Sequence, residues 1–410
     1  MASQIHSLIG NSENSILPVL LALALIILTA KFLGALANRL GQPTVLGELL
    51  AGLLLGPTFV DLLSLSFFEG TRVDVTIKQF AEIGVILLMF TAGLEVELSD
   101  LRRAGTPAIM AGLLGVLAPL GLGTGLGLIF DLGMSLSVFI GIVASATSVS
   151  ISAQTLMELG RLRSREGATL LGAAVIDDIV VIMVLSGFLV ITGGEGSIQT
   201  LALQLGKMIL VLLLVSLFAF VLMPRVAELS NRLRVSEGLI AVTLALVLLL
   251  AWATEYFGSV ASITGAFIAG LGLRGSHLRD EIEDSVHSLS FGFFVPIFLA
   301  DIGLRADIGA LEAGGLLFAT ALLVVAVFSK ILGSGSGAWA GGMHPKAALR
   351  IGTGMISRGE VGLIVAGVGI TEGILPQAQF THVVLMVLGT TILTPVLLRW
   401  LYRNGEAING

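Results

Sequence analysis

Two adjacent aspartates, Asp177 and Asp178, interrupt an apolar run over residues 167–192. A charged side chain at the centre of a bilayer costs roughly 2.5–3.5 kcal/mol on insertion scales, so a segment that keeps two of them is expected to use them. Carboxylates in such segments typically mark ion or proton pathways. The alternative, a polar patch buried between helices, does not require an acid pair. The pair therefore predicts a cation or proton site inside the membrane.

The two aspartates are expected to have different roles, because neighbouring residues on a helix point about 100° apart. One carboxylate can face a water-filled cavity and titrate, while a nearby cation neutralises the other. The natural partner is Lys330, which lies too deep in the run 313–340 to reach the interface easily. Lys207 is only one or two turns into its helix, and we interpret it as a snorkelling lysine.

Two other apolar runs carry polar residues near their middle. The run 135–157 contains Ser145, Thr147, Ser148 and Ser150, and the run 347–371 contains Ser357, Arg358 and Glu360 among glycines. Hydroxyls can also bond harmlessly to carbonyls of their own helix. We favour interrupted helices, which offer carbonyl oxygens to a cation and place half-helix dipoles at the membrane centre. Arg358 and Glu360 are then expected to compensate the broken ends, or each other.

The remaining titratable residues give weaker signals. Glu48 lies within the run 43–60, where a structural role is favoured over one in transport. The five histidines are scattered without metal-ligand spacing, so a transition-metal site is not expected. The chain has no cysteine, which excludes disulfides, thiolate metal sites and cysteine nucleophiles.

Composition identifies the class of protein. Apolar residues make up 55% of the chain and charged residues 12%, whereas soluble domains carry about 25% charged residues. The 52 glycines suit closely packed membrane helices. No basic run suggests nucleic acid. The N-terminus lacks a charged region and a cleavage site, so the first apolar run is expected to be a retained helix that contacts membrane lipid.

Apolar runs of spanning length predict an all-α membrane protein with about thirteen transmembrane helices. They are residues 16–37, 43–60, 77–98, 106–130, 135–157, 167–192, 199–223, 236–258, 260–274, 288–304, 313–340, 347–371 and 380–401. Most lysines and arginines fall in alternate loops. The positive-inside rule then places the N-terminus outside and the C-terminus in the cytoplasm.

Similar segments in the two halves of the chain predict two repeats. The sequence GELLAGLLLG (47–56) resembles GAFIAGLGLRG (265–275), and FTAGLEVELSDL (90–101) resembles ADIGLRADIGAL (300–311). Each pair lies seven helices apart, and since seven is odd the repeats must be inverted, a common transporter plan. We expect a first repeat at 1–192, a linker helix at 193–230, a second repeat at 231–403 and a short cytoplasmic tail at 404–410.

Together these residues carry a resemblance that covers essentially the whole chain. The chain resembles bacterial sodium/proton antiporters of the monovalent cation:proton antiporter superfamily, in the branch with an Asp-Asp pair. The resemblance implies that Asp178 carries cation and proton, that Asp177 pairs with Lys330, and that Thr147 and Ser148 lie beside the cation. It also implies a homodimer with an elevator-like moving core. Glutathione-gated potassium-efflux relatives carry a cytoplasmic nucleotide-binding domain, and we do not expect this chain to belong to that subgroup.

The expected function is therefore exchange of a monovalent cation for protons, electrogenic and without a cofactor, in a bacterial inner membrane. We expect the cation to be Na⁺. K⁺ is the alternative, because carboxylate and hydroxyl oxygens suit either alkali ion. Two rivals are less favoured. An aspartyl protease would need a second acid such as Asp301, at an outer helix end, and a channel would not need inverted repeats around a titratable site.

Overall fold

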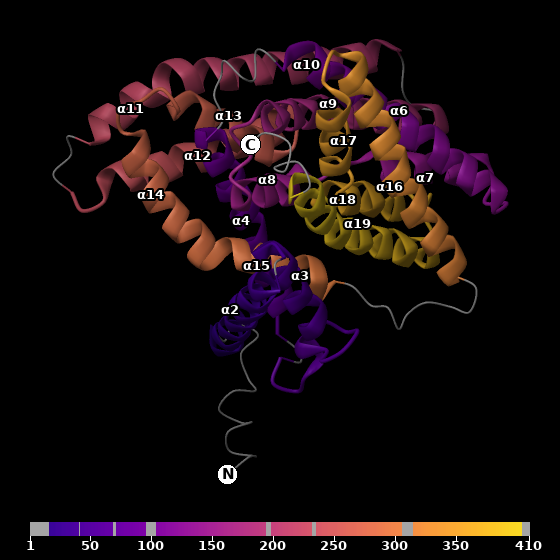
Figure 1. Cartoon of the computed structure of the whole chain (residues 1–410), viewed down its shortest axis with the longest axis horizontal. Coiled ribbons are helices and arrows are strands. Elements are labelled where there is room, and N and C mark those ends of the chain that lie inside the picture. The colour runs from indigo at the N-terminus through magenta and orange to yellow at the C-terminus, as the bar shows by residue number, and fades with distance from the viewer. Residues whose placement is uncertain are drawn as a thin grey trace.

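The structure, a computed structural model, describes residues 16–40, 42–68, 71–95, 104–193, 198–231, 235–305 and 315–403. The regular structure in these ranges is helical, and no strand occurs in them (Figure 1). The tail at 404–410 and four basic loop residues used for the orientation, Arg102, Arg103, Arg232 and Arg234, lie outside the described residues.

Length and composition of the helices identify a multi-pass integral membrane protein. Among the described residues, ten helices are long and apolar enough to cross a membrane. Three shorter apolar helices cover residues 44–55, 262–273 and 361–370. Large apolar side chains lie exposed on the surface, including Phe32 at 70% and Leu317 at 69%. Such a surface requires an apolar solvent, which the acyl chains of a bilayer supply.

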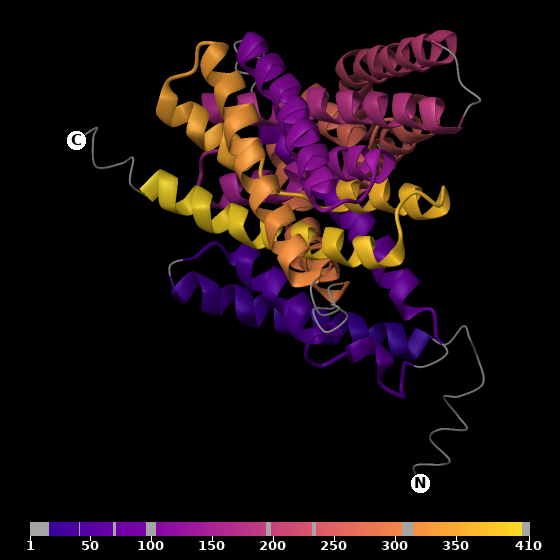
Figure 2. The ribbon, with the colours of Figure 1, turned by 90° about the vertical axis from the view of Figure 1, so that its right-hand side faces the viewer.

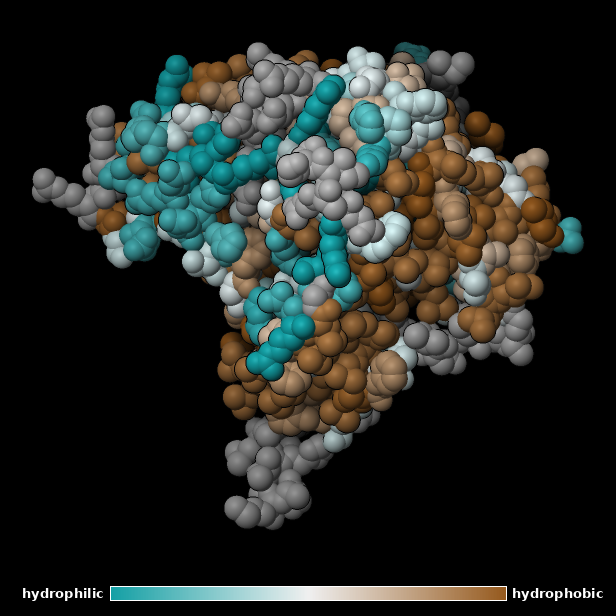
Figure 3. Space-filling view, viewed as in Figure 1, coloured by the Kyte–Doolittle hydropathy of each residue, from teal (hydrophilic) through white to brown (hydrophobic). Residues whose placement is uncertain are grey.

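The hydrophilic surface is confined. In Figure 3 apolar side chains cover the lower and right-hand parts of the face shown, and hydrophilic residues gather at the upper left. This region lies over α11 and α14 (Figure 1), and includes Asp280, whose side chain is 89% exposed, and Glu228, at 50%. These helix ends are therefore the part of this face that water contacts.

The helices form two groups. The broken-helix group comprises α6 (Gly105–Ile129), α7 (Met134–Ser145), α8 (Val149–Glu158), α9 (Arg165–Gly193), α16 (Gly315–Ala340), α17 (Pro345–Gly354), α18 (Glu360–Thr371) and α19 (Gln377–Arg403). Its members pack mainly on one another, above all α16 on α6 and α6 on α7. Glycines allow this close packing: a Cβ on Gly337 of α16 would lie 2.2 Å from the carbonyl oxygen of Met110 on α6.

The flanking group contains the other helices. It comprises α2 (Ile16–Arg39), α3 (Thr44–Leu55), α4 (Val73–Glu95), α10 (Ile198–Leu217), α11 (Met223–Ser230), α12 (Gly238–Gly258), α13 (Ser262–Leu273), α14 (Arg279–Leu289) and α15 (Val295–Leu304), with a short 3₁₀ turn at Leu62–Ser64. In Figure 2 the N-terminal helices α2 and α3 form a separate layer below α19. Each group draws on both halves of the chain.

The two groups meet at few places, mainly where α8 contacts α3 and α4. At the end of α8, Glu158 accepts hydrogen bonds from the backbone N–H groups of Thr44 (2.7 Å) and Val45 (3.1 Å). The carboxylate thereby caps the otherwise unpaired N-terminus of α3. Nearby, Arg163 bonds to Glu283 of α14 at 3.3 Å. These polar contacts at the border can exchange for water more readily than apolar packing can.

The structure contains both interruptions that the sequence predicts. Between α7 and α8 the chain leaves the helical conformation at residues 146–148, with Ser148 extended at φ −104° and ψ 111°. Between α17 and α18 it does so at residues 355–359. Polar and glycine residues favour these breaks, because they bond to the backbone outside a helix or lack helix propensity.

Two helices contain π-helical turns that the sequence analysis missed. Residues Phe218–Leu222 join α10 to α11, and residues Ser290–Phe294 join α14 to α15. A proline lies two residues after the end of each turn, Pro224 and Pro296, and proline cannot donate a helical hydrogen bond. The second segment also begins earlier than expected, at Arg279 rather than near 288, because the charged α14 continues it toward the water-exposed surface.

Candidate functional site

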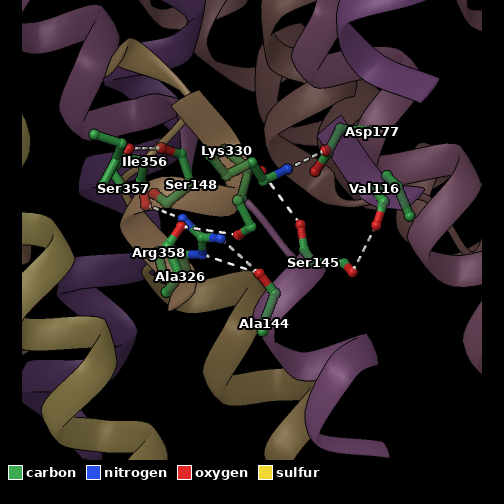
Figure 4. Close-up of polar contacts among 12 residues, drawn as sticks. Val116, Ala144, Ser145, Ser148, Asp177, Ala326, Lys330, Ile356, Ser357 and Arg358 are labelled. Carbon is green, nitrogen blue, oxygen red and sulfur yellow. Dashed lines mark hydrogen bonds and ion pairs between the residues drawn. The ribbon is translucent and has the colours of Figure 1, made fainter. Parts of the chain in front are cut away.

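Helix α9 places both aspartates inside the protein. Asp177 is fully buried and Asp178 is 6% exposed. The ammonium of Lys330 on α16 donates to Asp177 Oδ1 at 2.5 Å, with both side chains fully buried. Figure 4 shows the two side chains pointing at each other from their separate helices. The buried charges thus neutralise each other within the broken-helix group.

Space for this ion pair comes from a glycine on α6. A Cβ on Gly115 would lie 2.2 Å from Ser334 Oγ and 3.6 Å from Lys330 Nζ, so an alanine would displace the Ser334 side chain and touch the Lys330 ammonium. Two oxygens here, Asp177 Oδ2 and Ser334 Oγ, find no hydrogen-bond partner among the described residues. The neighbourhood of Lys330 therefore has acceptor capacity beyond the single ion pair.

Asp178 points toward the flanking group instead. Its Oδ2 lies 3.5 Å from Thr264 Oγ1 on α13. The two side chains line one pocket, together with Met89 of α4, Val149 of α8 and apolar residues of α9 and α13 (Leu171, Ala174, Val175, Ile263, Phe267). The sequence analysis missed Thr264, since a single threonine in an apolar helix carries no signal. The pocket places the Asp178 carboxylate at the border between the two groups.

The two breaks are joined by hydrogen bonds between Ser148 and Ser357. The N–H of Ser148 donates to the carbonyl oxygen of Ser357 at 2.9 Å, and Ser357 Oγ donates to the carbonyl oxygen of Ser148 at 2.5 Å. Gly359 permits this approach, since a Cβ there would lie 2.8 Å from the Ser148 side chain. Each break thus satisfies backbone groups that the other break exposes.

Arg358 neutralises the carbonyl ends of the half-helices. Its guanidinium donates to the carbonyl oxygen of Ala144 through Nε (3.2 Å) and Nη2 (2.6 Å), and to that of Ile356 through Nη1. Ala144 lies in the last turn of α7, and Ile356 follows α17 (Figure 4). A cation at a helix C-terminus compensates the negative end of the dipole. Helix α18 begins at Glu360, but the side chain of Glu360 lies outside the described residues.

Thr147 and Ser148, both buried, lie in the first break. Thr147 Oγ1 donates to the carbonyl oxygen of Ser145 over a long 3.4 Å. The next residue, Val149, lines the pocket that contains Asp178. The structure therefore brings the first break to the border of that pocket.

Two other acids of the sequence analysis lie elsewhere. Glu48 of α3 bonds to Lys31 of α2 at 2.8 Å, and Asp301 of α15 forms a two-point pair with Arg305, at 2.7 and 2.9 Å. Both acids belong to the flanking group and form ion pairs within it. Lys207 of α10 is exposed, as expected for a snorkelling lysine.

Comparison with known proteins identifies the family. Residues 6–403 match the sequence profile of the sodium/hydrogen exchanger family, which describes its transmembrane part. The chain belongs to this family. It is a membrane transporter that exchanges ions, and it is not an enzyme.

Curated relatives align over almost the whole chain. A Na⁺/H⁺-K⁺ antiporter of Bacillus cereus, GerN, is 36% identical over 93% of this chain and 95% of its own. A Na⁺/H⁺ antiporter of Enterococcus hirae is 33% identical over 92% and 97%, respectively. The sodium proton antiporter MjNhaP1 of Methanocaldococcus jannaschii has a similar fold, with a TM-score of 0.65 and 18% identity over 95% of this chain and 98% of that one.

Proposed function

We propose that this chain exchanges Na⁺ for H⁺ across a membrane by alternating access, with Asp178 as the carboxylate that both ions share. The observation that carries the proposal is that the two adjacent aspartates have different surroundings. Lys330 holds Asp177, while Asp178 lines a pocket at the border between the helix groups. A carboxylate placed there can bind a cation or a proton, and each excludes the other.

Competition for one carboxylate makes the exchange obligatory. On one side of the membrane a proton leaves Asp178 and a cation binds, and on the other side the reverse occurs. The site must change its exposure between these events. The two helix groups suit such a movement, because each is well packed internally and the contacts between them are fewer. We propose that the broken-helix group carries Asp178 past the flanking group, in the manner of an elevator.

The broken helices would supply the rest of the ion site. In this proposal Thr147 and Ser148 offer hydroxyl or carbonyl oxygens beside the cation, as half-helices do in other transporters. Arg358, with Glu360, stabilises the broken ends and does not bind the transported ion. Lys330 releases a proton as Asp178 takes up a cation, so each cycle moves net charge.

The topology proposed here has thirteen crossings. The ten long helices and three shorter apolar ones support it, with residues 1–192 and 231–403 as inverted repeats around a linker at 193–230. The loop charges favour an external N-terminus and a cytoplasmic C-terminus. We further propose a homodimer in a bacterial inner membrane, because the resemblance implies it.

The choice of cation has one specific alternative. GerN is named a Na⁺/H⁺-K⁺ antiporter and is 36% identical, so K⁺ is the second candidate substrate. Purified protein in liposomes, with a pH-sensitive dye inside, distinguishes the candidates when Na⁺, Li⁺ and K⁺ are added in turn. A response to none of them would contradict the proposed function.

The apparent affinity for Na⁺ is expected to fall as the pH falls. Protons occupy the shared carboxylate at low pH, so more Na⁺ is needed to displace them. In the simple competitive limit the KM rises about tenfold for each pH unit below the pKa of the site. The measurement is the KM for Na⁺ in liposomes at several pH values. A KM independent of pH would point to separate sites for the two ions.

Alanine at Thr147 or Ser148 is expected to raise the KM for Na⁺ and leave the fold intact. The two hydrogen bonds between Ser148 and Ser357 use the backbone of Ser148 and not its side chain. Thr147 Oγ1 makes only a long hydrogen bond to the carbonyl oxygen of Ser145. Losing one polar contact to an ion corresponds to about a tenfold rise in KM. Melting temperatures serve as the control. A large loss of stability with an unchanged KM would assign these residues to packing.

A further inference from the structure

Thr264 is a residue of the flanking group that faces the proposed carrier, Asp178. It lies in the first turn of α13 and is 3% exposed. Its Oγ1 is 3.5 Å from Asp178 Oδ2, and both residues line the same pocket. Helix α13 packs mainly on α4 and α12, so Thr264 does not belong to the group that holds the aspartates and the broken helices.

The separation of the two oxygens is long for a hydrogen bond. Hydroxyl-to-oxygen bonds have a typical length of about 2.7–2.8 Å. A cation shared by the two oxygens is compatible with this spacing. An ion with metal–oxygen distances of about 2.4 Å, as for Ca²⁺ and the similarly sized Na⁺, holds two ligands at right angles about 3.4 Å apart. The separation of 3.5 Å between Asp178 Oδ2 and Thr264 Oγ1 is close to this value.

The surroundings favour a positive ion between these oxygens. Apart from Asp178 and Thr264, the residues that line the pocket are apolar, so these two residues supply the polar side-chain atoms of its lining. In such surroundings a carboxylate and a hydroxyl bind a cation more strongly than they do in water. A threonine hydroxyl suits this task because it offers oxygen lone pairs without adding a second charge.

We propose that Thr264 Oγ1 is a ligand of the transported cation. This inference rests on the proposed function, in which Asp178 carries the cation. It adds a ligand from the flanking group to a site that is otherwise built by the broken-helix group.

The placement has a consequence for the affinity of the two conformations for the cation. When the broken-helix group moves, Asp178 moves away from Thr264, and the cation loses one oxygen ligand. The two conformations then differ in their affinity for the cation, and a ligand shifts a conformational equilibrium only through such a difference. Thr264 therefore favours cation binding in the conformation described here and release in the other.

Replacement of Thr264 by valine tests the proposal, because valine keeps the shape and removes the oxygen. At alkaline pH, where protons compete least, the KM for Na⁺ is expected to rise about tenfold with little change in kcat, the effect of one lost contact to a charged group. Thr264→Ser, which keeps the oxygen, is expected to restore the wild-type KM.

The matched control is Thr243→Val on α12. Thr243 is 1% exposed, and its hydroxyl has no partner among the described residues, so valine there should leave the KM unchanged. A second measurement does not require transport. Na⁺ should raise the melting temperature of wild type and Thr264→Ser in detergent more than that of Thr264→Val. Thr264→Ala is measured in parallel in case valine prevents folding.

The outcomes separate the two proposals. If wild type neither exchanges Na⁺ nor is stabilised by it, the proposed function fails. If wild type exchanges Na⁺ and the valine and alanine variants keep its KM, the assignment of Thr264 is overturned and the function stands. A shifted pH profile with an unchanged KM at alkaline pH would also overturn it, since Thr264 would then only position Asp178.

Discussion

Asp178→Asn is expected to abolish Na⁺/H⁺ exchange. The amide has nearly the same shape as the carboxylate, but it does not titrate at physiological pH and carries no charge to hold a cation. A carrier that cannot release a proton cannot take up a cation in exchange. In liposomes loaded with a pH-sensitive dye, Na⁺ should produce no response from this variant at any pH.

The fold of this variant should survive. Asp178 is 6% exposed and lies beside the Thr264 hydroxyl, and an asparagine side chain can keep a polar contact there. The melting temperature should therefore stay close to that of wild type, and it serves as the control for folding. Glu48→Gln provides a matched control for charge, because Glu48 is also a buried acid but pairs with Lys31 in the flanking group. Robust exchange by Asp178→Asn would refute its assignment as the carrier.

Lys330→Ala is expected to destabilise the protein by about 3–5 kcal/mol, the typical cost of breaking a buried ion pair. The substitution leaves Asp177 charged in a fully buried position without its ammonium partner at 2.5 Å. Adding Asp177→Ala removes the unpaired charge, so the double variant should recover part of the loss. Thermal unfolding in detergent of wild type, both single variants and the double variant gives the coupling between the two residues. Additive losses would refute the pairing.

The same pair should determine whether transport moves charge. If Lys330 releases its proton when Asp178 binds a cation, exchange is electrogenic in wild type. Lys330→Gln is then expected to exchange more slowly or without net current. Currents recorded on a solid-supported membrane, beside dye-based rates from the same liposomes, separate exchange from charge movement. Intact exchange without current in wild type would contradict the electrogenic part of the proposal.

The contacts between the helix groups show where a movement would have to begin. Glu158 caps the N-terminus of α3, and Arg163 pairs with Glu283 of α14. These bonds are polar and lie at the end of α8 and in the loop after it. If the broken-helix group moves as proposed, they must break and form again in each cycle. Surface pairs of this kind contribute about 1 kcal/mol or less, so they do not prevent such a movement.

The sequence by itself determined the class of protein and the places where chemistry is concentrated. Composition and run length predicted a multi-pass membrane protein, because few soluble proteins combine so many apolar runs with so little charge. The polar residues around Thr147 and Arg358 predicted the two helix breaks, which the structure contains between α7 and α8 and between α17 and α18. The cost of charge in a bilayer identified Asp177, Asp178 and Lys330, since that cost depends on residue type and run length alone.

Only the tertiary structure decided which groups meet. Helical geometry separates the directions of Asp177 and Asp178, but it does not say which faces α16 and which faces α13. That depends on how helices far apart in the chain pack, as with Lys330 and Asp177, which are 153 residues apart. The carbonyls that Arg358 neutralises and the position of Thr264 beside Asp178 were likewise invisible, because a lone threonine or arginine becomes informative only through its neighbours in space.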